Sequence, residues 1–379
     1  MKVLVSIFRI IVGVVFIYSG FVKANDPLGF SYKLDEYFEV FGTALKSQAF
    51  TDFMLPFSLF LAIFMCVLEM ILGFALLIGA RIKLTLWLLL ALVIFFGFLT
   101  FYSAYFDVVK TCGCFGDAIK LTPWQSFTKD IVLMALIIVI FVGKSNINPL
   151  VGPKFENFLM SVFILKSIAF PIYTWNYLPI IDYRPYAIGK NIPEQTVGKP
   201  DVTKFYYKLK DKKTGDEKEF DAFPPDYDKY YDYIDTRTEL ITKGIDPPIK
   251  DFALTDLEGN DITQTIITNS NNNFLLIAYS LDGSDTDVQG RINDFFELCQ
   301  KDGKEFVCLT ASSLEKIDSF KKEKKAGYDF VSCDGTVLKT MIRSNPGLML
   351  LKNGTVIDMW HYHSFPSYND VKTKYFGDK

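Results

Sequence analysis

The sequence lacks a basic excess and has little histidine. Its 379 residues carry 40 Lys and Arg against 43 Asp and Glu, a formal net charge of −3, with two His. Nucleic-acid binding calls for a clustered positive charge, so nucleic acid is excluded as a partner. His361 and His363 alternate along one predicted strand, and two such residues alone make a weak metal site. We therefore expect no bound metal.

The first 180 residues have few charges. They hold 13 basic and 10 acidic side chains, whereas the remaining 199 residues hold 27 and 33. A membrane-spanning helix needs about 20 predominantly apolar residues. Five segments meet or approach this length: Val3–Val22, Phe53–Gly79, Leu84–Phe106, Phe127–Val142 and Phe155–Leu178. The sequence therefore predicts an α-helical membrane bundle of about five helices, followed by a water-soluble region.

The basic residues of the short loops indicate how the bundle is oriented. Such residues favour the cytoplasmic side of a membrane. If successive helices cross the membrane in opposite directions, the same side of the membrane carries Lys2, Arg81, Lys83, Lys144 and Lys154. We therefore expect a cytoplasmic N-terminus, with the loop 107–126 and everything after about residue 177 on the opposite face. In a Gram-negative cell, this chain would lie in the inner membrane with its C-terminal region in the periplasm.

The soluble half divides into a linker and a regular domain. Residues 179–200 are rich in Pro and Gly, and 205–210 with 218–220 predict a hairpin. From residue 249, apolar strands alternate with helices, which predicts parallel crossovers. The predicted strands are 274–280, 305–311, 329–333, 348–351 and 355–362, and the predicted helices are 285–300 and 314–325. The expected division is 1–145, 146–178 (a fifth membrane helix), 179–248 and 249–379.

This order of elements resembles the thioredoxin fold, in which a cis proline stands where Asn345–Pro346 precedes a hairpin strand. One feature of that fold is missing. A thioredoxin-like oxidoreductase needs C-x-x-C at the start of the first core helix, where the helix N-terminus lowers the pKa of the attacking thiol. Here the segment reads SLDGSD over Ser280–Asp285. We therefore expect an α/β thioredoxin-like domain that binds or docks rather than one that exchanges thiols.

Cys112 and Cys114 are separated by a single glycine in the loop after the third apolar segment. A disulfide closing so short a ring departs from relaxed geometry and is more easily reduced. Redox exchange is therefore one interpretation, beside a structural staple, half of a metal site or no role. The other cysteines lie on apolar patterns, where a free cysteine is commonly a small buried hydrophobe. They are Cys66, Cys299, Cys308 and Cys333.

Two charged residues lie inside predicted membrane helices. Ionisable groups in a bilayer are costly, and they indicate function by default. Arg9 lies about two turns into the first helix from its cytoplasmic end, and Glu69 lies nearly three turns from the cytoplasmic end of the second. A functional ion pair between them is one interpretation. The other is that Arg9 extends to the interface and Glu69 takes a different polar partner.

A set of residues in the first half of the chain carries a family resemblance. It comprises C-G-C-F-G at 112–116 and Arg9, Gly13, Phe16, Ser19, Gly20, Lys23, Asp26, Pro27, Gly29, Glu69, Gly73, Gly79, Trp124 and Asp130. With these residues, the N-terminal region resembles the DoxX and MauE group of four-helix membrane proteins over about residues 1–145. The segment 178–194 further resembles a linker in DoxX-type proteins of Bacteroidetes, in which a fifth helix and a thioredoxin-like domain follow. The resemblance implies disulfide formation in partner proteins or electron transfer to a quinone.

Two functions follow from these observations. In the first, Cys112 and Cys114 take electrons from an exported protein and pass them to a membrane acceptor, with Arg9 or Glu69 handling protons. Quinone as that acceptor is implied by the family resemblance only. In the second, the chain is a non-enzymatic, membrane-anchored subunit whose cysteine-free domain docks an envelope complex. Both imply membrane lipid and a periplasmic protein as partners, and neither fixes the oligomeric state.

Overall fold

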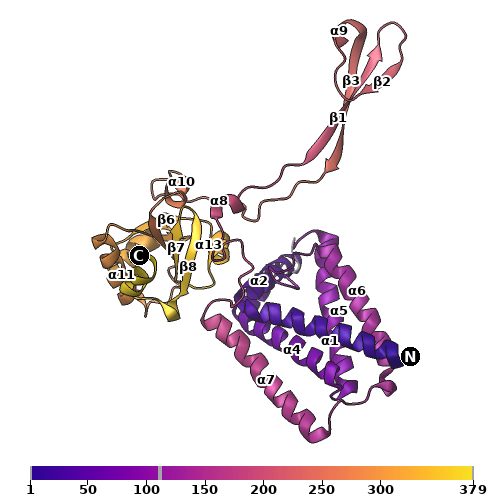
Figure 1. Cartoon of the computed structure of the whole chain (residues 1–379), viewed down its shortest axis with the longest axis vertical. Coiled ribbons are helices and arrows are strands. Elements are labelled where there is room, and N and C mark those ends of the chain that lie inside the picture. Colours follow the sequence, from indigo (N-terminus) through magenta and orange to yellow (C-terminus); the bar gives the residue numbers. More distant parts are fainter. Residues whose placement is uncertain (1, 110–112, 378–379) are drawn as a thin grey trace.

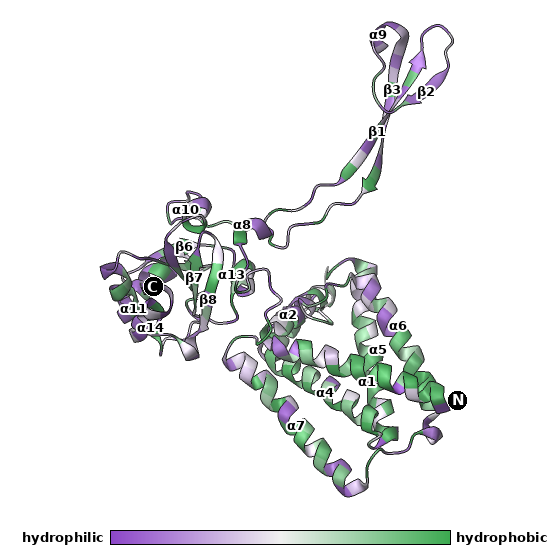
Figure 2. Cartoon of the chain, viewed as in Figure 1, coloured by the Kyte–Doolittle hydropathy of each residue, from purple (hydrophilic) through white to green (hydrophobic). Residues whose placement is uncertain are grey.

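The N-terminal half is a helical bundle. The computed structural model describes residues 2–109 and 113–377. Within these residues, five helical stretches are long and apolar enough to span a membrane, and Figure 2 shows them as the green part of the chain. They are α1 (Lys2–Asn25), the run Gln48–Ile78, α5 (Ile82–Phe106), α6 (Pro123–Val142) and α7 (Pro153–Asn176); the run comprises α3 (Gln48–Met54), η1 (Leu55–Phe57) and α4 (Ser58–Ile78). The predicted five-helix membrane region is confirmed.

Helices α1 and α4 pack closely because glycines face each other. A Cβ added at Gly73 would lie 2.7 Å from the carbonyl oxygen of Gly13, and one at Gly20 would lie 2.8 Å from that of Cys66. Gly13 of α1 lies opposite Gly73 of α4, and the later Gly20 lies opposite the earlier Cys66, so the two helices are antiparallel. Small residues at such positions let helix backbones approach in a membrane. Helices α5 and α6 complete the core.

Between α1 and α4 lies a further helix, α2 (Pro27–Ala44), which is not among the five apolar segments predicted from the sequence. Helix α2 begins after Asp26, whose side chain caps it by accepting the Gly29 N–H at 2.9 Å. Its buried face includes Phe30, Leu34 and Tyr37. These residues recur at helical spacing, but α2 also carries charges and is too polar to span a bilayer. Figure 1 shows it at the end of the bundle nearest the soluble domain.

The linker leads into an arm that projects away from both domains (Figure 1). After the short α8 (Ile192–Gln195), three antiparallel strands pair in the order β2-β1-β3. They are β1 (Val202–Asp211), β2 (Glu217–Phe220) and β3 (Tyr231–Thr242), with α9 (Tyr227–Tyr230) before β3. The predicted hairpin is confirmed, whereas β3 was missed because its residues follow no clear alternation.

The C-terminal domain is a five-stranded mixed sheet. Its strands are β4 (Asn272–Ile277), β5 (Glu305–Thr310), β6 (Asp329–Ser332), β7 (Gly347–Lys352) and β8 (Thr355–His361), in the order β6-β5-β4-β7-β8. Strands β4, β5 and β6 are parallel, β7 runs against them, and β8 is antiparallel to β7. The helices are α10 (Thr263–Ile267), α11 (Gln289–Lys301), α12 (Leu314–Lys324), α13 (Gly335–Met341) and α14 (Tyr368–Tyr375). The Asn345–Pro346 peptide is cis, and the predicted thioredoxin-like fold is confirmed.

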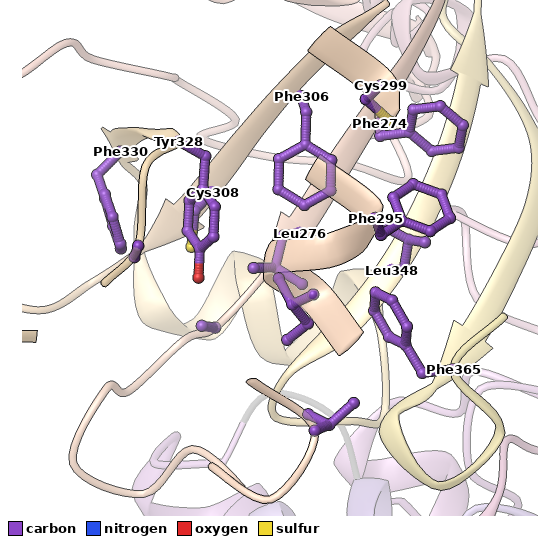
Figure 3. Close-up of a cluster of buried hydrophobic side chains, with 14 of the residues drawn as sticks. Phe274, Leu276, Phe295, Cys299, Phe306, Cys308, Tyr328, Phe330, Leu348 and Phe365 are labelled. Atoms are coloured by element: carbon purple, nitrogen blue, oxygen red, sulfur yellow. The ribbon is translucent and has the colours of Figure 1, made fainter. Parts of the chain in front are cut away.

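Aromatic side chains fill one side of this sheet (Figure 3). Phe274 of β4 meets Phe295 of α11 edge to face, with ring centroids 5.0 Å apart. Cys299 and Cys308 are buried in the same cluster. Cys333 is buried in the cluster on the other side of the sheet. Together with Cys66 in the bundle, these free cysteines pack as hydrophobes, as predicted.

Candidate functional site

The C-G-C loop connects α5 to α6. Cys112 lies outside the described residues. Gly113 and Gly116 adopt φ values of +68° and +51°, which let the backbone turn tightly. Cys114 is only 8% exposed, and its carbonyl oxygen accepts a hydrogen bond from the Ser19 hydroxyl of α1 at 3.0 Å. The second cysteine of the motif is therefore held against α1 instead of facing solvent.

Beneath this loop, Lys23 of α1 forms a buried ion pair with Glu69 of α4. The two side chains are 2% and 3% exposed. Side chains on a helix tilt toward its N-terminus, so on two antiparallel helices Lys23 and Glu69 tilt toward each other. The Lys23 ammonium also lies over the rings of Phe30 and Phe96, at 5.1 and 4.7 Å from their centroids. These contacts hold a cation inside the bundle.

The same cation lies beside a thiol of the C-G-C loop. Lys23, Glu69 and Cys114 line one small cavity. A positive charge beside a cysteine favours its thiolate and makes it a better leaving group in disulfide exchange. Lys23 is one of the residues that carry the family resemblance, but the resemblance implies no chemical role for it. Its position at the end of an apolar segment is typical of an interfacial lysine, so the sequence carried no signal that its amine turns inward.

The predicted pairing of Arg9 with Glu69 is wrong. Arg9 donates a hydrogen bond to the carbonyl oxygen of Leu77 at 3.1 Å. Leu77 and Glu69 are eight residues apart on α4, which corresponds to about 12 Å along the helix axis. Glu69 is therefore out of reach of Arg9 and takes Lys23 instead. The interpretation that gave Glu69 a different polar partner fits this geometry.

A second ion pair, between Lys129 and Asp130, lies beside the pair of Lys23 and Glu69. Asp130 of α6 is 2.8 Å from the Lys129 ammonium and accepts a hydrogen bond from the Thr100 hydroxyl of α5 at 3.0 Å. A cavity of about 20 Å³ is lined by both ion pairs and by Cys114. A water molecule needs roughly 10–15 Å³ of such space. The cavity can hold one water but not a quinone ring, so no quinone step is assigned to it.

The thioredoxin-like domain is joined to the membrane domain next to this site. Arg343, which ends the turn after α13, donates to both carboxylate oxygens of Asp26 at 2.8 and 2.9 Å. Its Nη2 lies 3.8 Å from Asp117 of the C-G-C loop. Burial alone would raise the pKa of Asp26, but the Arg343 guanidinium outweighs that effect and holds the pKa below its ordinary value. The two domains thus share a buried ion pair.

The edge that faces the bundle is the one that carries the dithiol in redox-active thioredoxin folds. The Tyr279 hydroxyl, directly before the SLDGSD segment, accepts a hydrogen bond from Tyr32 of α2 at 3.4 Å. Within that segment, the Ser280 carbonyl accepts the Asn345 amide at 2.9 Å. No cysteine occurs between Ser280 and Asp285. This edge therefore makes contacts but cannot exchange thiols.

Comparison with known proteins defines the membrane domain. Residues 1–143 match the family model described as methylamine utilisation protein MauE. The membrane domain is thus similar to MauE, and a thioredoxin-like domain follows it in the chain. No curated protein matches it.

Two solved structures resemble the C-terminal part weakly. One is a solution structure of a candidate protein disulfide isomerase from Bacteroides thetaiotaomicron, with 16% identity, 33% of this chain and 83% of that chain covered, and a TM-score of 0.28. The other is StoA from Bacillus subtilis, with 17% identity, 32% and 92% covered, and a TM-score of 0.26. The fold assignment rests instead on the order and directions of the strands.

Proposed function

We propose that this protein oxidises exported dithiols through its C-G-C loop, as a thiol–disulfide exchange component of the membrane. The observation that carries the proposal is the burial of Cys114 beside the Lys23–Glu69 ion pair. A structural staple needs no buried cation, whereas a leaving thiolate is stabilised by one. The match to MauE supports a redox-associated role in the membrane, without identifying the reacting residues or the electron acceptor.

In the proposed exchange, the exported protein attacks Cys112. A thiolate of the exported protein attacks the Cys112 sulfur of a Cys112–Cys114 disulfide, a mixed disulfide forms, and Cys114 leaves as a thiolate beside Lys23. The second thiolate of the exported protein then attacks that protein's first cysteine sulfur, which is bonded to Cys112 in the mixed disulfide. A disulfide forms within the exported protein, and Cys112 leaves as a thiolate. The exported protein loses two electrons, and the loop gains them. Cys114 takes the leaving role because its burial keeps an incoming protein away from it.

The proposal includes an orientation and an acceptor. The basic loops support a cytoplasmic N-terminus, which puts the C-G-C loop and the thioredoxin-like domain in an oxidising compartment, the periplasm of a Gram-negative cell. A membrane electron acceptor must then reoxidise the loop. Quinone stays an expectation from the family resemblance, because the cavity beside Glu69 is too small for its ring.

The second candidate function is a non-enzymatic docking subunit. The projecting arm of β1, β2 and β3 favours it, since most of the residues in these strands are exposed. The edge next to Tyr279 does not favour it, because that edge already contacts the chain's own membrane domain. A docking role would therefore use the arm or the outer faces of the thioredoxin-like domain.

Single cysteine variants test the redox proposal. The Cys114→Ser variant cannot form the loop disulfide, so its Cys112 thiolate can join an exported protein only by attacking a disulfide of that protein, the reverse of the proposed exchange. Because Cys114 is then absent and cannot displace that protein, we expect roughly tenfold more mixed disulfide in cells than in the wild type. Cys112→Ser should accumulate little, because Cys114 is buried. Non-reducing gels with partner identification by mass spectrometry provide the measurement.

Cys299→Ser is the matched control, since that thiol is buried in the soluble core and should leave the pattern unchanged. If the double variant Cys112→Ser, Cys114→Ser oxidises exported proteins as well as the wild type does, the redox proposal is wrong and the docking function replaces it.

A further inference from the structure

A cavity of about 430 Å³ lies between the membrane domain and the thioredoxin-like domain. Its walls come from four parts of the chain: the end of α1 with α2, the C-G-C loop, the start of the linker and α13. Gly113 and Gly116 of the loop line it directly. The volume falls within the range of ligand pockets, roughly 300–1,000 Å³. The cavity is therefore large enough for a ligand and adjoins the loop proposed to react.

The frame of this cavity is fixed by contacts between distant segments. Asn25 at the end of α1 donates to the Ile181 carbonyl at 2.7 Å, and its own amide oxygen accepts the Ile181 N–H at 3.1 Å. Arg343 joins the opposite wall to Asp26. The cavity is thus built from both domains, and it is incomplete without the thioredoxin-like domain.

The lining suits a peptide better than a small ion. It contains as many carboxylates as cationic side chains, and the two arginines are already paired, Arg184 with Asp182 and Arg343 with Asp26. A charged small ligand would find no surplus of the opposite sign. The walls present polar groups beside apolar ones such as Phe30, which matches a polar backbone with side chains of mixed character.

We infer that this cavity binds an extended, cysteine-bearing segment of the exported substrate protein and presents it to the C-G-C loop. The inference rests on the proposed function and adds the place where the substrate binds. It gives the cysteine-free domain a role without redox chemistry, since α13 and Arg343 supply the outer wall of the site. The domain then selects proteins over small thiols.

The test fills the cavity from each wall in turn. Thr340→Trp acts from α13 and Glu39→Trp acts from α2, and both residues line the cavity. Thr373→Trp on α14 is the matched control, because Thr373 is exposed and does not line the cavity. The purified full-length protein, with its loop oxidised, is mixed with reduced, unfolded ribonuclease A or with dithiothreitol. Loop reduction is followed by thiol alkylation and mass spectrometry.

The measured quantity is the ratio of the ribonuclease rate to the dithiothreitol rate. We expect this ratio to fall roughly tenfold in both cavity variants and to stay at the wild-type value in Thr373→Trp. An unchanged ratio in Thr340→Trp and Glu39→Trp overturns the inference while leaving the proposed function intact. If neither reductant reduces the wild-type loop, the proposed function itself fails and takes the inference with it.

Discussion

At the scale of single residues, the ion pair between Lys23 and Glu69 is the most unusual feature of the bundle. Taking two charges out of water costs several kcal/mol per ion, and their attraction repays this only with good geometry. Here the lysine is further held by two aromatic rings. One oxygen of Glu69, Oε2, has no hydrogen-bond partner in the described part of the chain and belongs to a residue lining the water-sized cavity. Under the proposed function, the pair serves the chemistry at Cys114 more than the stability of the bundle.

Removing one member of this pair should destabilise the bundle. Lys23→Met leaves Glu69 as a buried, unpaired charge, which costs about 3–5 kcal/mol in comparable cases. We expect a clearly lower midpoint of thermal unfolding in detergent, measured by the fraction that stays monodisperse after heating. Lys33→Met is the matched control, since its pair with Glu36 is half-exposed and such pairs contribute about 0–1 kcal/mol. Equal midpoints for the two variants would contradict this account.

The sequence showed which residue types matter at this site but not how they pair. Arg9 and Glu69 are conspicuous because they interrupt apolar runs, and Cys114 because of its motif. Their partners depend on the register between α1 and α4, and a single helix pattern does not contain that register. Arg9 and Lys23 lie about four turns apart on α1, and the register decides which of them Glu69 meets. The choice of partner therefore needed the structure.

At the scale of elements, the contact between α1 and α4 depends on the absence of side chains at glycines. Gly73→Ala would put a methyl group 2.7 Å from the backbone oxygen of Gly13, and a backbone atom cannot rotate away. We expect the helices to separate at a cost of about 1–3 kcal/mol, as in other overpacked cores. The same thermal assay in detergent measures the change.

Gly97→Ala on α5 is the control for this prediction. The added methyl would come no closer than 3.9 Å, to the Asp130 Cβ. Alanine is the better helix former by roughly 0.5–1 kcal/mol, so this variant should be as stable as the wild type or slightly more stable. A similar loss in both variants would show that the close approach of α1 and α4 does not decide stability.

Elements with a clear period were predictable, and those without one were not. The alternation of apolar strands and helices after residue 249 gave the mixed sheet, and Pro346 marked the start of its hairpin. Helix α2 was overlooked because its charges suggested a loop, although Asp26 followed by Pro27 is a helix-start signal. Strand β3 lies in a projecting arm with little to bury, so its side chains carry no alternation to read.

At the scale of the whole molecule, the two domains meet through residues that the sequence places far apart. Asp26 and Arg343 are 317 positions apart, and His363 donates a hydrogen bond to the Asn176 carbonyl at the end of α7 at 2.7 Å. Nothing in either segment predicts the other, because local patterns report on local structure only. The thioredoxin-like domain is thus seated on the C-G-C side of the bundle by side chains whose role is visible only in three dimensions.

The docking of the two domains should depend on pH through Asp26. Arg343 holds the pKa of Asp26 below its ordinary value of about 3.9, so the carboxylate favours the docked state above about pH 4. This contribution is lost as the pH falls through the lowered pKa. Arg343 stays charged throughout, because Asp26 raises its already high pKa despite burial. The other groups that act on Asp26 or pair with Arg343 are Arg184, Tyr32 and Asp117.

Spin labels on α2 and α13 can measure this docking. With labels at Glu39→Cys and Thr336→Cys in a Cys112→Ser, Cys114→Ser background, pulsed electron resonance should give a narrow distance distribution from pH 5 to pH 8 and one that broadens progressively as the pH falls below about 4. Asp26→Asn should broaden it at every pH, and because asparagine caps a helix as well as aspartate does, α2 should stay intact. Asp246→Asn removes only an exposed ion pair with Lys250 and should behave like the unsubstituted labelled protein. A narrow distribution at pH 7 in the Asp26→Asn protein would mean that other contacts hold the domains together, and that the ion pair with Arg343 does not.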